Sequence, residues 1–221
     1  MLSSAILQII AMICMLIDHV GAYLVGDFWL MRMIGRLAMP IFVFGLVEGF
    51  IHTSSRLKYF IRIAIFAIIT EVVLYFLQQN MGQSLTHNIL FNFLLAFIVL
   101  ICIEKSKWCL FFVPILAGLA TYLRIDYGWA VIVLAIGFYF TLKYCKKQSS
   151  RYQIGILLSL CVTNGLLALI DNNLFQLLAI FTAIPLILYS GKKGKRLPKY
   201  LSYSFYPAHL LLILIIRLLF Y

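Results

Sequence analysis

Long runs of hydrophobic residues, separated by short polar segments, follow one another along the whole chain. A membrane-spanning helix needs about 20 mostly apolar residues, and breaks at charged residues, Gly, Pro and Asn mark the ends of such runs. On these criteria we predict an all-α fold, a polytopic bundle of about nine transmembrane helices that forms a single domain over 1–221. Because several runs are short, eight or ten helices also fit. The predicted spans are 5–25, 30–51, 58–78, 87–103, 108–123, 127–142, 153–170, 174–190 and 200–220.

The composition supports a membrane protein and excludes other classes. Of the 221 residues, 64% are hydrophobic and 11% are charged, whereas soluble domains are about 45–50% apolar and about 25% charged. An ordinary soluble protein and a nucleic-acid-binding module are therefore excluded, and we expect a lipid bilayer and no nucleic acid as the partner. The five cysteines show no metal-like spacing, so we expect free thiols and no metal site. The first apolar run contains Asp18 and His19 without preceding basic residues, so we expect it to be retained as a helix.

The basic residues gather in alternate loops between the predicted spans. The chain has 18 Lys and Arg against 7 acids, and most of the basic residues follow even-numbered spans. The positive-inside rule places these loops, and the N-terminus, in the cytoplasm. The run at 191–196 lacks the spacing of a P-loop. We therefore interpret it as a topology signal, with attraction of a cytoplasmic nucleotide phosphate as the alternative. The residues that could attract such an anion are Arg56, Lys58, Arg62, Lys192, Lys193, Lys195 and Arg196.

Ionisable residues inside the predicted spans fall in one layer of the outer half of the membrane. A charge within the bilayer is costly, so such residues usually face the bundle interior and often serve a function. At 1.5 Å per residue, these side chains lie roughly 7–10 Å below the outer edge. They could form a buried ion-pair network that fixes helix packing. A histidine, however, titrates near neutral pH and can act as a base, which favours catalysis. The layer holds Asp18, His19, Arg36, Glu71 and Asn92, with Arg32 and Asn88 one turn above and His87 at the rim.

Three further polar residues lie apart from this layer. Glu48 and His52 are near the cytoplasmic end of the second span, where a solvated helix end is the favoured interpretation. His209 lies near the middle of the last span, after Tyr206 and Pro207. A single histidine on an apolar helix is most often a hydrogen-bonded packing residue, and His209 is kept as a second candidate for a substrate site.

Several of these segments resemble the TraX family, named after the conjugation protein that N-acetylates pilin. The resemblance is specific over 5–95 and 200–217 and is weak in the middle of the chain. It is carried by I-I-A-M-I-C-M-L-I-D-H-V-G (9–21), R-M-I-G-R-L-A-M-P-I-F-V-F-G-L-V-E-G-F-I-H-T (32–53), Y-F-I-R-I-A-I-F-A-I-I-T-E (59–71), H-N-I-L-F-N (87–92) and S-Y-S-F-Y-P-A-H-L-L (202–211). The family positions matched are Asp18, His19, Arg32, Arg36, Glu48, Glu71 and His209.

The resemblance implies an acyltransferase of the bacterial inner membrane. Proteins of this kind take an acyl group from cytosolic acyl-CoA and modify acceptors across the membrane. The acceptor implied here is a peptide, a pilin-like subunit or a surface glycan, and acetyl-CoA is the expected donor.

Acyl transfer needs a base for the attacking group and donors or cations for the developing oxyanion. We expect His19 to be the base or acyl carrier, Asp18 or Glu71 to orient it, and Arg36 to stabilise the oxyanion. The substrate would contact Arg32, His87, Asn88, Asn92, Glu48 and His209. Two alternatives stay open: a proton-coupled transporter, since such a layer suits proton relay, and a non-catalytic membrane assembly factor.

Overall fold

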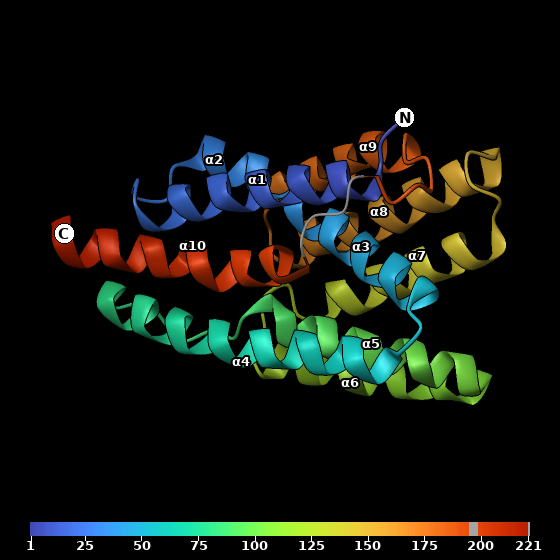
Figure 1. Cartoon of the computed structure of the whole chain (residues 1–221), viewed down its shortest axis with the longest axis horizontal. Helices are drawn as coiled ribbons and strands as arrows, with labels where there is room; N and C mark the ends of the chain where they lie inside the picture. Colours follow the sequence, from blue (N-terminus) through green and yellow to red (C-terminus); the bar gives the residue numbers. More distant parts are fainter. Residues whose placement is uncertain (195–198, 221) are drawn as a thin grey trace. The chain divides into compact units, whose positions relative to one another are not determined.

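The computed structural model describes residues 1–194 and 199–220, and within these ranges the chain is built of helices (Figure 1). Each predicted span contains a helical segment, so the all-α prediction is confirmed for the described residues. The helices long and apolar enough to cross a membrane are Ser4–Tyr23, Trp29–His52, Arg56–Met81, Ser150–Ile170 and Ser202–Phe220. Trp108–Tyr122, Trp129–Tyr144 and Leu174–Ile187 are apolar but shorter. The chain is thus a membrane protein, and its nine crossings and orientation stay a prediction.

The chain forms two compact units. The first unit comprises 1–52 and 133–194, and the second comprises 53–132 and 199–220. The elements of the first unit are α1 (Ser4–Tyr23), α2 (Trp29–Gly35), α3 (Ala38–His52), most of α7 (Trp129–Tyr144), α8 (Ser150–Ile170), the 3₁₀ helix η2 (Leu174–Thr182) and α9 (Ala183–Ile187).

In the first unit, α1 packs on α2 and α3, and α8 packs on η2. The α1–α2 contact is close because α2 ends in Gly35, where a Cβ atom would overlap the Asp18 carboxylate. The core is aromatic. The Phe44 ring makes edge-to-face contacts with Phe138 at 5.6 Å and Tyr189 at 5.4 Å between centroids, an arrangement that aromatic quadrupoles favour.

The second unit contains α4 (Arg56–Met81), α5 (Ile89–Lys105), the 3₁₀ helix η1 (Lys107–Phe112), α6 (Val113–Tyr122), the first turn of α7 and α10 (Lys199–Phe220). Helix α10 lies along α4, and α4 packs on α5 (Figure 1). Ser55 caps the start of α4 by accepting from the Lys58 N–H, and Gly82 ends the helix with a φ of 61°, a left-handed conformation that favours glycine. The 26 residues of α4 span about 39 Å, more than the roughly 30 Å hydrocarbon core.

Candidate functional site

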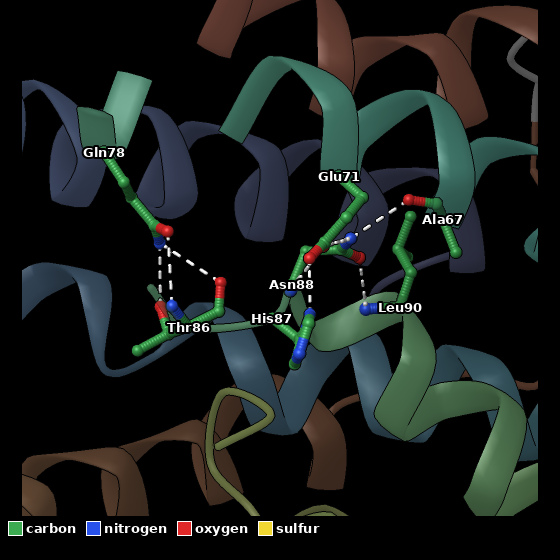
Figure 2. A network of polar contacts seen from close by, with 7 residues as sticks. All are labelled: Ala67, Glu71, Gln78, Thr86, His87, Asn88 and Leu90. Atoms are coloured by element: carbon green, nitrogen blue, oxygen red, sulfur yellow. Dashed lines mark hydrogen bonds and ion pairs between the residues drawn. The ribbon is translucent and has the colours of Figure 1, made fainter. Parts of the chain in front are cut away.

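The second unit contains a network of polar contacts around the Glu71 carboxylate of α4 (Figure 2). Glu71 Oε1 is 2.5 Å from His87 Nδ1. Glu71 Oε2 accepts hydrogen bonds from the Asn88 backbone N–H at 3.1 Å and from Asn88 Nδ2 at 2.6 Å. Both carboxylate oxygens therefore have partners, and their orientation is fixed by three contacts.

Asn88 holds this network to the helices on either side. Its Nδ2 also donates to the Ala67 carbonyl at 3.0 Å, one turn before Glu71 on α4. Its Oδ1 accepts from the Leu90 N–H at 3.0 Å and so caps α5, which is a common role of asparagine at a helix start. Asn88 is buried. Its described contacts are to the protein itself, and its predicted contact with a substrate stays a prediction.

A second clamp holds the segment just before His87. Gln78 Nε2 donates to Thr86 Oγ1 at 2.8 Å and to the Thr86 carbonyl at 3.2 Å, while the Thr86 N–H donates to Gln78 Oε1 (Figure 2). Ala67, Glu71 and Gln78 follow a spacing of four and seven residues, which places them on one face of a helix. This face of α4 therefore fixes the backbone of 86–88, and with it the position of the His87 ring.

The loop before α7 supports His87 from another direction. The His87 N–H donates to the Arg124 carbonyl at 3.1 Å, and the Asp126 N–H donates to the His87 carbonyl at 2.9 Å. Asn92 Nδ2 donates to the carbonyls of Asp126 and Gly128 at 3.0 and 2.6 Å. Both Asn92 N–H groups therefore hold this loop, and its buried Oδ1 has no hydrogen-bond partner among the described residues.

The His87 ring can act as a base in this setting. A carboxylate only accepts hydrogen bonds, so Glu71 favours the tautomer with the proton on Nδ1. The basic lone pair is then on Nε2, which makes no hydrogen bond with the described residues. The His87 side chain is 50% exposed and that of Glu71 28%, so a substrate can approach. The sequence placed His87 at the rim without assigning it this role. The spacing gave one weak signal, a histidine directly before a helix-capping asparagine.

In the first unit, Asp18 of α1 forms an ion pair with Arg32 of α2. Arg32 Nη1 is 2.6 Å from Asp18 Oδ2, and Arg32 Nε is 3.2 Å from Asp27 Oδ1. The Asp18 side chain is 15% exposed. The neighbouring His19 ring lies 5.7 Å from the Tyr23 ring, and Arg36 is the residue that follows α2. This unit therefore brings Asp18 and Arg32 together as an ion pair that also joins two helices.

Glu48 was expected to lie at a solvated helix end, and this prediction is wrong for its side chain. Its side chain is only 14% exposed. Its Oε1 accepts from Lys147 Nζ at 2.8 Å and from the Tyr189 hydroxyl at 2.7 Å, and His52 Nδ1 lies 3.7 Å away. Lys147 and Tyr189 are distant in the sequence, so the apolar pattern around Glu48 gave no sign of this cluster.

His209 is a buried packing residue of α10. Its Nδ1 is 2.6 Å from the Phe205 carbonyl one turn earlier. Its ring stacks on those of Phe205 and Tyr206, with centroids 5.1 and 5.6 Å apart. These contacts favour the interpretation of a hydrogen-bonded packing residue over that of a substrate site.

The basic candidates divide by their contacts. Arg56 pairs with Glu104 at 2.5 Å, and Lys58 is exposed. Arg62 lies between two tyrosine rings. The carbonyls of Lys192 and Lys193 accept from the N–H groups of Ser4 and Ala5, so this segment holds the start of α1. Lys195 and Arg196 lie outside the described residues.

The apolar helices and the polar networks at their ends define an all-α integral membrane protein. The model of the family described as TraX protein matches residues 3–217, and the chain belongs to the TraX family. It is 28% identical over 235 residues to a probable fimbrial assembly protein FimC, serogroup H1, of Dichelobacter nodosus, covering 94% of this chain and 92% of the relative. It is 33% identical over 138 residues to the uncharacterized protein RP591 of Rickettsia prowazekii (strain Madrid E), covering 59% and 52%. No solved structure matches significantly.

Proposed function

We propose that this protein is an acyltransferase of the bacterial inner membrane that moves an acyl group from cytosolic acyl-CoA to an amine or hydroxyl group. Acetyl is the first acyl group to test. The family and the name of the FimC relative, a probable fimbrial assembly protein, make a pilin-like subunit the first acceptor to test. Another peptide or a surface glycan is the next. The observation that carries the proposal is the Glu71–His87 pair, an imidazole held by a fixed carboxylate.

This pair suits the proton transfer that acyl transfer requires. His87 Nε2 would take the proton of the acceptor N–H or O–H while the acceptor nitrogen or oxygen forms a bond to the acyl carbon. The carbon–sulfur bond of the thioester then breaks, and the CoA thiolate takes the proton back from His87 Nε2. Glu71 would stabilise the imidazolium between these steps, in the way that the carboxylate of a catalytic triad does.

His19, which directly follows Asp18 of the Asp18–Arg32 pair in the sequence, is the second candidate for the base. Arg32 and Arg36 would then bind the donor carbonyl or the oxyanion. His87 is the first candidate, because its ring contacts the Glu71 carboxylate.

The test is acyl transfer by the purified full-length protein in lipid nanodiscs. Radiolabelled acetyl-CoA is the donor, and a pilin N-terminal peptide and a surface oligosaccharide are the acceptors. We expect His87→Ala to lower transfer by about 10²–10⁴-fold, the usual contribution of a general base. His52→Ala is the matched control, because His52 is another half-exposed histidine beside a glutamate. Equal rates for His87→Ala and wild type would refute the role of His87.

A second candidate function is non-catalytic assembly of surface appendages, which the name of the FimC relative supports. It predicts that His87→Ala cells still assemble appendages and that the protein releases no CoA from acetyl-CoA. A proton-coupled transporter is the third candidate, because a half-exposed Glu–His pair also suits proton relay. It predicts uptake driven by a pH gradient into proteoliposomes.

A further inference from the structure

Arg62 of α4 carries a guanidinium group flanked by aromatic rings. Its Cζ atom is 5.9 Å from the centroid of the Tyr59 ring and 5.8 Å from that of the Tyr203 ring of α10. Tyr203 in turn stacks on Phe66 at 5.6 Å, with an angle of 18° between the rings. The rings of both helices therefore hold the guanidinium in place, since cations are attracted to aromatic faces.

Three hydrogen-bond donors at this position have no acceptor among the described residues. Arg62 Nε is buried and makes no hydrogen bond with the residues that the structure describes. The hydroxyl groups of Tyr59 and Tyr203 likewise make none with the part of the chain that the structure describes. A buried donor without an acceptor is costly, so the buried Arg62 Nε–H group, beside two partly buried tyrosines, points to an acceptor that the protein does not supply.

The acids of the second unit are engaged elsewhere. Glu104 pairs with Arg56 at 2.5 Å, and Glu71 binds His87 and Asn88. Glu71 is nine residues from Arg62, or about 13.5 Å along the helix. Asp126 is in the loop that pairs with the His87 backbone, at the Glu71 end of the unit. Within this unit, no described carboxylate neutralises Arg62.

The position of Arg62 along α4 indicates which anion it meets. Arg62 is six residues, about 9 Å, from the start of α4, and the helix is longer than the hydrocarbon core by a similar amount. Because the charged residues Arg56 and Lys58 are at the start of α4, we expect the excess length at this end, which would place Arg62 near the headgroups. The anions at such a boundary carry phosphate, which the planar guanidinium group binds through paired N–H groups.

We propose that Arg62, Tyr59 and Tyr203 bind a phosphate group at the basic end of α4. The phosphate oxygens would accept hydrogen bonds from the guanidinium group and the two phenol hydroxyls. Two sources share this chemistry, the phosphates of CoA and the headgroup of an anionic phospholipid. The site does not require acyl transfer, since phosphate binding can be measured without turnover.

The test measures binding by the full-length protein with two probes. The first is CoA, titrated calorimetrically against protein in phosphatidylcholine nanodiscs. The second is phosphatidylglycerol, whose retention in detergent is read by native mass spectrometry against phosphatidylcholine. We expect Arg62→Gln to weaken binding of one probe by about tenfold to a hundredfold. Tyr203→Phe removes only a hydroxyl and should weaken the same probe a few-fold, which separates loss of the site from misfolding.

Arg217→Gln is the matched control. Arg217 is also an arginine of this unit, and its Nε donates to Asn80 Oδ1 at 3.0 Å. We expect it to leave both probes unchanged. If Arg62→Gln loses CoA binding alone, the ligand of the site is CoA. If Arg62→Gln loses phosphatidylglycerol binding alone, the ligand is an anionic phospholipid. Unchanged binding of both probes in Arg62→Gln and Tyr203→Phe would overturn the proposal, whether or not the protein transfers acyl groups.

Discussion

Replacing Glu71 with glutamine tests the proposed role of His87 as the base, because the substitution exchanges one carboxylate oxygen for an NH₂ group. Glu71 Oε2 accepts from two N–H groups of Asn88, and Oε1 contacts His87 Nδ1. A glutamine side chain has one carbonyl oxygen and one NH₂ group. The oxygen must take the Oε2 position, because an NH₂ group there would face two donors. The NH₂ group then faces His87 Nδ1, which must become an acceptor.

This exchange moves the imidazole proton to Nε2, the nitrogen that would have to accept the proton of the attacking group. The same tautomer error in a serine-protease triad lowers kcat by about 10⁴-fold. We expect a loss of about 10²–10⁴-fold in acyl transfer here, equivalent to about 2.7–5.5 kcal/mol of transition-state stabilisation. The fold should persist, because the contacts with Asn88 keep an acceptor.

The assay compares initial rates of acetyl transfer for wild type, Glu71→Gln and Asp171→Asn. Asp171 is an exposed acid at the end of α8 and controls for loss of a negative charge. Size-exclusion profiles and thermal unfolding midpoints would test whether the variants are folded. A folded Glu71→Gln protein that works within threefold of wild type would refute the reasoning about the tautomer.

Two further predictions concern stability, measured as the thermal unfolding midpoint in detergent. Lys147→Ala leaves Glu48 Oε1 with the Tyr189 hydroxyl as a hydrogen-bond donor and His52 Nδ1 at 3.7 Å, so we expect a loss of about 1–3 kcal/mol. The exposed Lys146→Ala should change little, and equal midpoints for the two variants would contradict this. Gly35→Ala forces a methyl group against the Asp18 carboxylate and should cost about 1–3 kcal/mol. A Cβ atom at Gly45 would have nothing within 4 Å, so Gly45→Ala should not lower the stability of the protein. A similar loss of stability in Gly35→Ala and Gly45→Ala would argue against close packing of α1 on α2.

The helices could be predicted from the sequence because each is an apolar run with polar ends. The span predicted at 58–78 is α4 (Arg56–Met81), and its ends differ because the Ser55 cap and the left-handed Gly82 extend the helix on both sides. Periodicity does not reveal these local hydrogen bonds. The ends of an apolar run therefore mark where the lipid stops, while the caps decide where the helix stops.

The site could be predicted only in part. Depth along the helices placed Glu71 in the ionisable layer, Asn88 one turn above it and His87 at the rim, and the structure joins all three. That Glu71 contacts His87 depends on the turn after Gly82 and the Gln78–Thr86 clamp, which residue spacing does not specify. Glu48 was missed for another reason. Its partner Lys147 is 99 residues away, beyond the reach of any local pattern.

The most direct test of the central claim compares His87→Ala and His19→Ala in one assay, the acceptor-dependent release of CoA from acetyl-CoA by the reconstituted protein. The account predicts that wild type releases CoA in step with acceptor acetylation. It also predicts that His87→Ala lowers the rate of CoA release by about 10²-fold or more, while the variant still binds acetyl-CoA. Wild-type release that continues unchanged in His87→Ala and stops in His19→Ala would place the base in the first unit. The absence of any CoA release by the folded wild type would contradict the acyltransferase itself.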